Sequence, residues 1–185
     1  MIEFRPFPKI ARLRREMIVT EKIDGTNAQV TVLEDGTVLA GSRNRWITPE
    51  ADNHGFARWV KEHEDELREG LGIGTHFGEW WGKGIQRGYG LTEKRFSLFD
   101  VSRWSRVGEA TLPGAVEVPS CCHVVPVLIV DTFSTGVAEA VLRELRKYGS
   151  VASLGFMDVE GVVVFHAHSR TLFKLTVDDG HKGDA

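Results

Sequence analysis

The stretch Glu21-Lys22-Ile23-Asp24-Gly25-Thr26-Asn27 is the part of the sequence around which we expect the fold to be organised. The four residues before it, Met17-Ile18-Val19-Thr20, are apolar or β-branched and predict a strand. Asp24-Gly25 is a turn signal, so Lys22 is expected at the end of that strand, close to a turn. A lysine in such a place can be a nucleophile once its amine has lost its proton, which burial or a neighbouring cation favours. The alternative is an exposed lysine beside an ordinary Asp-Gly hairpin turn.

The pattern K-x-D-G at Lys22 to Gly25 resembles motif I of the covalent nucleotidyltransferases, which include ATP-dependent DNA ligases, RNA ligases and mRNA capping enzymes. In that superfamily the motif lysine becomes covalently joined to a nucleotide, so the resemblance implies that Lys22 is the nucleophile. The longer form from Glu21 to Asn27 is most similar to the RNA ligase branch. By the same resemblance, Glu21, Asp24 and Asn27 are expected to bind the nucleotide.

An antiparallel hairpin is predicted directly after this motif. Apolar and polar residues alternate from Ala28 to Val32, Asp35-Gly36 marks a turn, and Thr37 to Ala40 forms the returning strand. The next residues, Ser42-Arg43-Asn44-Arg45, resemble motif Ia, whose arginine reaches the nucleotide sugar. We assign that role to Arg43 in preference to Arg45.

Two later strands carry candidate nucleotide contacts. The strand predicted at 75–82 contains Glu79, and burying that carboxylate without a partner would be costly. It resembles motif III, in which the glutamate accepts hydrogen bonds from ribose hydroxyls. The strand predicted at 95–101 resembles motif IIIa, in which an aromatic ring stacks on the purine; this would be Phe99, with Phe96 as the alternative. Without the resemblance, Glu79 would be interpreted as an exposed strand residue and both phenylalanines as core.

The segment from Lys83 to Gly90 is rich in glycine but lacks the order of a P-loop. It could present Lys83 and Arg87 to a nucleic-acid backbone and Tyr89 to a base. A mobile hairpin tip without a ligand is the alternative.

The last informative block, Val159 to Phe165, resembles motif IV, whose glutamate engages the divalent metal; here this is Glu160. The segment from Leu172 to Thr176 resembles motif V, whose lysine contacts the α-phosphate; here this is Lys174. Strand alternation places Lys174 on the face opposite to Phe173, so the lysine can point into a cleft.

Motif V departs from the family pattern, because many members carry two lysines there. Leu172 and Thr176 flank Lys174 where a second lysine would be expected, and Lys182 is a possible substitute. His166 and His168 could form a zinc pair, but exposed turn histidines are the simpler interpretation.

The remaining segments predict scaffold. Helical spacing from Phe56 to Leu71 predicts one helix, capped by Asp52 or Asn53 and ended by Gly72. A second amphipathic helix is predicted after Ser134 or Thr135, with the apolar stripe Val137, Val141, Leu142, Leu145 and Tyr148 and with Gly149 as its end. The apolar run 124–130 predicts a strand in which Pro126 indicates an edge or a bulge.

The motifs occur in the family's order between residues 21 and 176. The resemblance implies an α+β fold, the ATP-grasp-like nucleotidyltransferase domain of antiparallel β-sheets flanked by helices. We expect a single adenylation domain over residues 1–185. Few residues follow Lys174, so we expect no appended OB-fold, and a partner protein is a candidate source of that missing C-terminal domain.

The composition is that of an ordinary globular protein, with 42% hydrophobic and 26% charged residues and a net charge of −3. This charge excludes a uniformly basic surface but allows a local basic groove. No apolar run approaches a membrane span and no secretory signal is evident, so we expect a cytoplasmic protein that does not bind membranes. Cys121 and Cys122 are expected to be reduced core residues, and the basic segment 5–16 to be a solvated lead-in or a phosphate contact.

The function implied by the resemblance is an ATP-dependent RNA ligase that adenylylates itself on Lys22 with Mg²⁺ or Mn²⁺. AMP would pass to a 5′-phosphate end of a nucleic acid, RNA in preference to DNA, before attack by a 3′-hydroxyl. Three alternatives remain open: a capping-type enzyme that uses GTP, a nucleic-acid-binding module without catalysis, and a transferase that adenylylates proteins.

Overall fold

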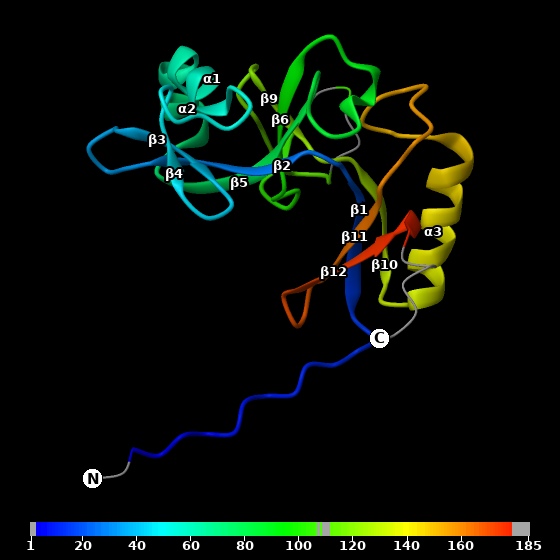
Figure 1. The fold of residues 1–185 in the computed structure, drawn as a ribbon. Coiled ribbons are helices and arrows are strands. Elements are labelled where there is room, and N and C mark those ends of the chain that lie inside the picture. Colours follow the sequence, from blue (N-terminus) through cyan, green and yellow to red (C-terminus); the bar gives the residue numbers. More distant parts are fainter. Residues whose placement is uncertain (1–2, 107, 109–111, 179–185) are drawn as a thin grey trace.

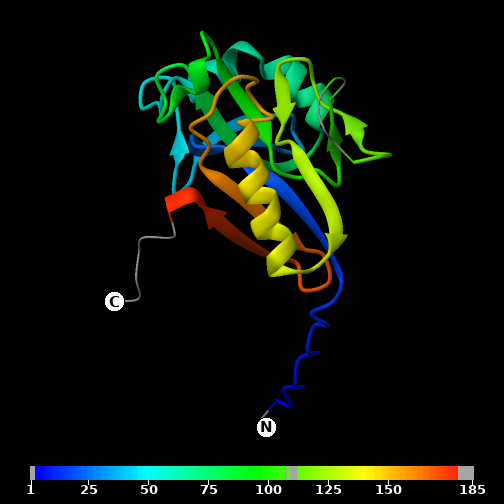
Figure 2. The same ribbon diagram turned by 90° about the vertical axis from the view of Figure 1, so that its right-hand side faces the viewer.

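The computed structural model describes residues 3–106, 108 and 112–178. Two β-sheets dominate this part of the chain, and each is covered by helices on one face (Figure 1). The four-stranded antiparallel sheet has the order β10 (Val127–Thr132), β1 (Glu16–Lys22), β11 (Gly161–His166) and β12 (Thr171–Thr176). Helix α3 (Thr135–Tyr148) covers it (Figure 2).

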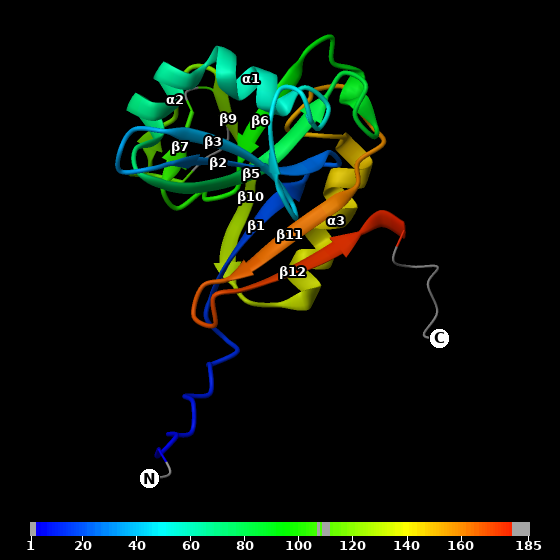
Figure 3. The ribbon, with the colours of Figure 1, turned by 60° about the vertical axis from the view of Figure 1, so that its left-hand side comes forward.

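The six-stranded sheet has the order β4 (Trp46–Ile47), β3 (Val38–Ser42), β2 (Thr26–Val32), β5 (Gly74–Gly82), β6 (Lys94–Leu98) and β9 (Cys122–Val124). Its strands pair in antiparallel fashion except β6 and β9. Helices α1 (Phe56–Glu62) and α2 (Glu64–Leu71) lie on one face of it (Figure 3). A short 3₁₀-helix (Gly88–Gly90) follows β5, and β7 (Trp104–Ser105) pairs with β8 (Val116–Glu117) in a small separate ribbon.

Alternation along the strands sets up two hydrophobic cores. In the six-stranded sheet Val30, Trp80 and Phe96 face α1 and α2. In the four-stranded sheet Met17 and Val19 face α3. Each sheet therefore presents its other face away from its own helices, and the predicted site residues lie mainly on those faces.

The predicted helix 52–72 is wrong in one respect, because the chain forms two helices that meet at His63. His63 leaves the helical region with φ −112° and ψ 18°. Its backbone N–H donates to the carbonyl oxygen of Trp59, and its Nδ1 lies 2.8 Å from the same oxygen. The predicted end at Gly72 is confirmed, but the predicted start is wrong, because the N-cap of α1 is Gly55 rather than Asp52 or Asn53. The Asp52 carboxylate nevertheless accepts the N–H of Ala57 in the first turn at 2.7 Å.

The strand predicted at 124–130 is also divided. Pro126 has no N–H to donate, and here the chain passes from β9 in one sheet to β10 at the edge of the other. The hairpin of β2 and β3 is confirmed, as are the Ser134 cap and the Gly149 end of α3. Tyr148, predicted in the apolar stripe of α3, is instead exposed.

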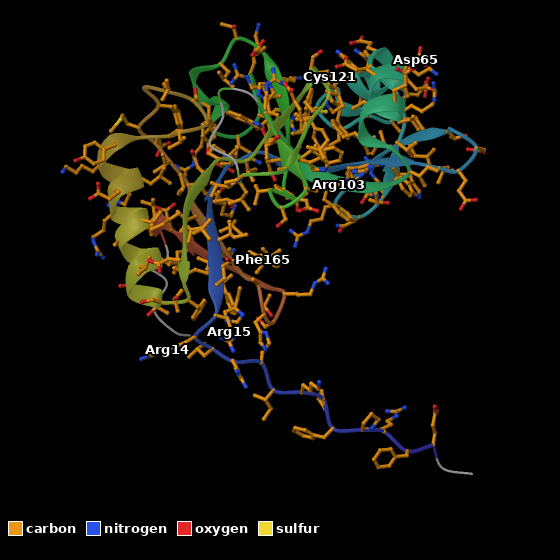
Figure 4. The ribbon with its side chains drawn as sticks, turned by 180° about the vertical axis from the view of Figure 1, so that it is seen from behind. Arg14, Arg15, Asp65, Arg103, Cys121 and Phe165 are labelled. Carbon is orange, nitrogen blue, oxygen red and sulfur yellow. The ribbon has the colours of Figure 1, made fainter. Side chains whose placement is uncertain are left out.

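The segment before β1 extends away from the sheets with its side chains exposed. Arg14 and Arg15 lie at its base (Figure 4). Cys121 and Cys122 are free thiols, and Cys122 is buried as predicted. None of the helices in the described residues is long and apolar enough to cross a membrane.

Candidate active site

Lys22 is the last residue of β1, and the turn that follows carries the chain from the four-stranded sheet into β2 of the six-stranded sheet. Gly25 lets this turn pack closely against β5. A Cβ atom at Gly25 would lie 2.5 Å from the carbonyl oxygen of Trp80 and 2.9 Å from Cγ of Glu79. The motif glycine is therefore required for close packing that brings Lys22 next to the strand of Glu79.

Lys22 forms an ion pair with Glu160, the residue before β11. Its Nζ lies 2.5 Å from Oε1 of Glu160, and the two side chains are 25% and 19% exposed. The pairing of Lys22 with Gly161 in adjacent strands places the two groups together. The other oxygen, Oε2 of Glu160, is buried and has no hydrogen-bond partner in the described part of the chain.

A buried carboxylate oxygen without a donor is costly unless a cation or a water binds it. Mg²⁺ is commonly held by one or two carboxylates together with substrate phosphates and waters. No group of three or more His, Cys, Asp or Glu side chains in the described residues could hold a metal ion. Glu160 thus fits a divalent cation that takes its other ligands from a nucleotide and from water.

Glu79 lies on β5 beside Asn27 of β2, and Nδ2 of Asn27 donates to its Oε2 at 2.9 Å. Burial raises the pKa of Glu79 to about 7, while the hydrogen bond from Asn27 and the charge of Lys22 act in the opposite direction. The charge of Glu160 also raises this pKa. Glu79, Lys22 and Glu160 are therefore close enough to interact electrostatically.

Arg43 begins the turn that follows β3. In the register of β2 and β3, Ala28 lies opposite Ser42, the last residue of β3, so Arg43 follows next to the end of β2 that carries Asn27. Its side chain is exposed and has no hydrogen bond or ion pair with any residue that the structure describes. Asn27 and Glu79 are thus neighbours on one sheet face, and Arg43 lies in the adjacent turn.

The structure distinguishes the two candidates for the stacking ring. Phe96 is fully buried against Phe56 and Trp59 under α1. Phe99 follows β6 and is 41% exposed, on the same face as Glu79. Only Phe99 has a ring face open to a ligand.

Lys174 projects from β12 on the same face of the four-stranded sheet as Lys22. Val163 lies between Thr20 and Lys174 in the register, so the Cα atoms of Lys22 and Lys174 are about two strand spacings and two residues apart, roughly 12 Å. The side chain of Lys174 is exposed and makes no hydrogen bond or ion pair with the described residues. Lys182 lies outside those residues.

Glu21 points to the other face of β1, away from Lys22. Its Oε1 accepts the Ser150 hydroxyl at 2.6 Å, and its Oε2 accepts the N–H groups of Val151 and Ala152 at 2.8 and 2.9 Å. Burial raises its pKa, and these hydrogen bonds partly oppose that effect. The structure therefore gives Glu21 a role in holding the loop after α3, and its position opposite to Lys22 does not favour the contact with the nucleotide that the resemblance implies.

Asp24 is held by two residues of the loop 83–90. Its Oδ2 accepts Nε of Arg87 at 2.9 Å, and its backbone N–H donates to the Tyr89 hydroxyl at 2.9 Å. Arg87 also contacts Asp158 at 2.6 Å, just before Glu160. Tyr89 is buried and does not present its ring to a base, so this part of the loop positions motif I. No local sequence signal predicts this contact, because 65 residues separate Asp24 from Tyr89.

Two other features lie apart from these residues. A cavity of about 330 Å³ beside α1 is lined in part by Arg58, Trp59, Lys83 and Lys94, but by none of the residues predicted to bind the nucleotide or the metal. His166 is buried, with Nε2 at 2.8 Å from the Leu13 carbonyl oxygen and Nδ1 accepting from Ser169. It is therefore a satisfied core histidine, neither an exposed turn residue nor half of a zinc pair.

Comparisons with known proteins agree with this fold. The model of the RNA ligase family matches residues 15–176. A mutant RNA ligase of Naegleria gruberi solved with AMP and Mn is similar at 18% identity and a TM-score of 0.61, over 89% of this chain and 50% of that one. An apo mutant of the same ligase has 20% identity and a TM-score of 0.60, over 90% of this chain and 50% of that one. A mutant with ATP and Mn has 21% identity and a TM-score of 0.59, over 92% of this chain and 53% of that one. The chain spans about half the length of these structures, which confirm the predicted α+β nucleotidyltransferase-type fold.

Proposed function

The chain belongs to the RNA ligase family, and from this premise we propose that it is an ATP-dependent RNA ligase that first transfers AMP to Lys22. The observation that carries the proposal is the pairing of Lys22 with a carboxylate whose second oxygen is buried without a partner in the described residues. This pair joins the candidate nucleophile to the candidate cation ligand.

In the first step the deprotonated Nζ of Lys22 attacks the α-phosphorus of ATP. A bond forms between this nitrogen and phosphorus, the bond from phosphorus to the bridging oxygen breaks, and pyrophosphate leaves. The amine gives up one proton in becoming the phosphoramidate. The protein acts mainly by positioning and electrostatics in such a transfer.

The other residues bind and orient the nucleotide. Asn27, Arg43 and Glu79 hold the ribose, and Phe99 stacks on the adenine. Lys174 attracts the α-phosphate, and Asp24 fixes the turn after Lys22 through Arg87. Glu160 would hold Mg²⁺ or Mn²⁺, which would supply positive charge that neutralises the phosphate oxygens.

In the later steps AMP passes from Lys22 to the 5′-phosphate of an RNA strand. The 3′-hydroxyl of a neighbouring strand end then attacks that phosphate, AMP leaves, and a phosphodiester bond is formed. These steps complete an RNA ligase reaction that consumes one ATP.

The test is intact-protein mass spectrometry after incubation with ATP and Mg²⁺ or Mn²⁺. We expect a gain of one AMP from ATP, no gain of GMP from GTP, and no gain in Lys22→Ala. The protein should first be treated with pyrophosphate, so that AMP already bound after purification is removed. A GMP adduct would favour a capping-type enzyme. No adduct on folded protein would favour a binding module instead.

A further inference from the structure

One row of residues crosses the face of the six-stranded sheet that α1 and α2 do not cover. Trp46 pairs with Gly41, Gly41 with Gln29, and Gln29 with Phe77. The N–H of Phe99 donates to the carbonyl oxygen of Phe77, which continues the row past the end of β6. Residues paired in this way project on the same face of a sheet.

The three aromatic rings of this row are unusually open. Trp46 is 55%, Phe77 57% and Phe99 41% exposed. The residues that follow Trp46 and precede Phe77, Ile47 and His76, are buried on the helix side. The row is therefore an uncovered aromatic surface on an otherwise well-packed sheet.

Polar groups suited to a nucleic acid accompany the rings. The Gln29 side chain lies over Gly41, since a Cβ there would be 2.7 Å from both Cγ and Nε2 of Gln29. The Gln29 amide has no hydrogen bond with the residues that the structure describes. Arg45, in the loop between β3 and β4, is exposed, and its guanidinium group is likewise unpaired within the described ranges.

We propose that Trp46, Gln29 and Phe77 form a binding surface for unpaired bases of the RNA strand, an inference that rests on the proposed function. Phe99 is assigned to the adenine of ATP, and Phe77 is its neighbour in the row, so a base on Phe77 would lie next to the nucleotide. Trp46 is three strand spacings from Phe77, roughly 14 Å, which separates two bases. Aromatic rings stack on bases of any sequence, and arginines bind the phosphates between them. The unpaired Arg45 and the free amide of Gln29 favour a nucleic acid over a protein partner.

The test compares two 5′-phosphorylated RNA oligonucleotides of equal length, one normal and one in which the central nucleotides are abasic. Binding is measured by fluorescence anisotropy at one salt concentration, because phosphate contacts are salt-dependent. The variants are Trp46→Ala, Trp46→Phe, which keeps a ring, and Tyr148→Ala, which removes an equally exposed ring from α3.

We expect Trp46→Ala to weaken binding of the normal RNA about 5- to 100-fold. Its binding of the abasic RNA should be unchanged, and Trp46→Phe and Tyr148→Ala should bind as the wild type does. Gain of AMP by Trp46→Ala, measured by mass, should stay at the wild-type level. The AMP measurement tests the ligase proposal separately from the RNA-binding proposal. A wild-type protein that gains no AMP would contradict the ligase proposal, and the anisotropy measurement would still test RNA binding.

Equal RNA binding by Trp46→Ala and the wild type would overturn the proposal. So would an equal loss for both oligonucleotides, which would make Trp46 a structural residue. A wild-type dimer that Trp46→Ala converts to a monomer would show that the row is a protein interface.

Discussion

The Nζ of Lys22 and the Oε1 of Glu160 lie 2.5 Å apart although 138 residues separate them in the chain. Antiparallel pairing of β1 with β11 produces this contact, because Lys22 lies opposite Gly161. A Cβ at Gly161 would lie 2.9 Å from Cα of Thr176 in β12, so glycine lets β11 and β12 approach closely at this point. The fold therefore places the candidate nucleophile and the candidate cation ligand together at a strand end.

Glu160→Gln should impair AMP transfer through the metal. The amide keeps the size of the side chain but loses the charge that a divalent cation requires. We expect the initial rate of AMP addition at a fixed Mn²⁺ concentration to fall on the order of 100-fold or more. Measuring the rate against Mn²⁺ concentration should show that more metal is needed. Glu139→Gln, on the exposed surface of α3, is the control and should behave as the wild type; a Mn²⁺ requirement unchanged in Glu160→Gln would show that the metal binds elsewhere.

Glu79 should make stability depend on pH. Its folded-state pKa is about 7 against an ordinary value of 4.5, so the folded protein binds more protons between these pH values than the unfolded chain. The contribution of Glu79 to stability therefore falls as the pH rises from about 4.5 to about 7. Glu79→Gln removes the ionisation and should be more stable than the wild type at pH 8, by up to roughly 3 kcal/mol, with little difference at pH 5.

Urea unfolding at the two pH values measures this difference. Glu69→Gln, an exposed carboxylate on α2, should show no such pH dependence. If Glu79→Gln gains nothing at pH 8, then Asn27 and Lys22 compensate fully for the burial of the charge, and Glu79 is ionised at neutral pH.

Phe99→Ala should mainly weaken ATP binding, whereas Phe96→Ala should mainly lower the stability of the fold. Phe99 is partly exposed, so its loss should cost about 1 kcal/mol or less of stability, while the Kd for ATP rises about 5- to 100-fold. Phe96 is fully buried, and its loss should cost roughly 3 to 5 kcal/mol. Thermal unfolding and ATP titration of both variants check this. If the Phe99→Ala variant is unfolded, or if it binds ATP as tightly as the wild type does, then Phe99 does not stack on the adenine.

Local sequence signals predicted the elements around Lys22 well. The strand before it, the Asp-Gly turn and the β2–β3 hairpin depend on neighbouring residues, and the structure has all three. The sequence does not predict the helix break at His63, because the apolar spacing continues through that residue. The break is visible only in the structure, in the backbone angles of His63 and its contacts with the Trp59 carbonyl oxygen. Pro126 correctly indicates a sheet edge, because β9 and β10 are both edge strands. The change of sheet at Pro126 is not predicted, since the sequence cannot show which sheet a strand joins.

The contacts of the site depended on long-range pairing that spacing cannot reveal. Alternation correctly placed Lys174 opposite to Phe173, but nothing in the sequence linked Asp24 to Arg87 or placed Trp46 level with Phe77. The row on which our further inference rests is produced by the register of four strands. Its members, such as Gln29, Trp46 and Phe77, are far apart in the sequence. The motif resemblance pointed to Asn27 and Glu79, whereas the row from Trp46 to Phe99 is apparent only in the structure.

Glu21 provides the last prediction, because its position separates a structural role from a nucleotide contact. Glu21→Ala leaves two N–H groups and the Ser150 hydroxyl without their acceptor and should cost roughly 3 kcal/mol or more. Glu21→Gln retains an acceptor oxygen and should cost less. Since the carboxylate lies on the face of β1 opposite to Lys22, we expect folded Glu21→Gln to need the same ATP concentration for half-maximal AMP addition as the wild type. A clear rise in that concentration, with unfolding by urea unchanged, would show instead that Glu21 contacts the nucleotide.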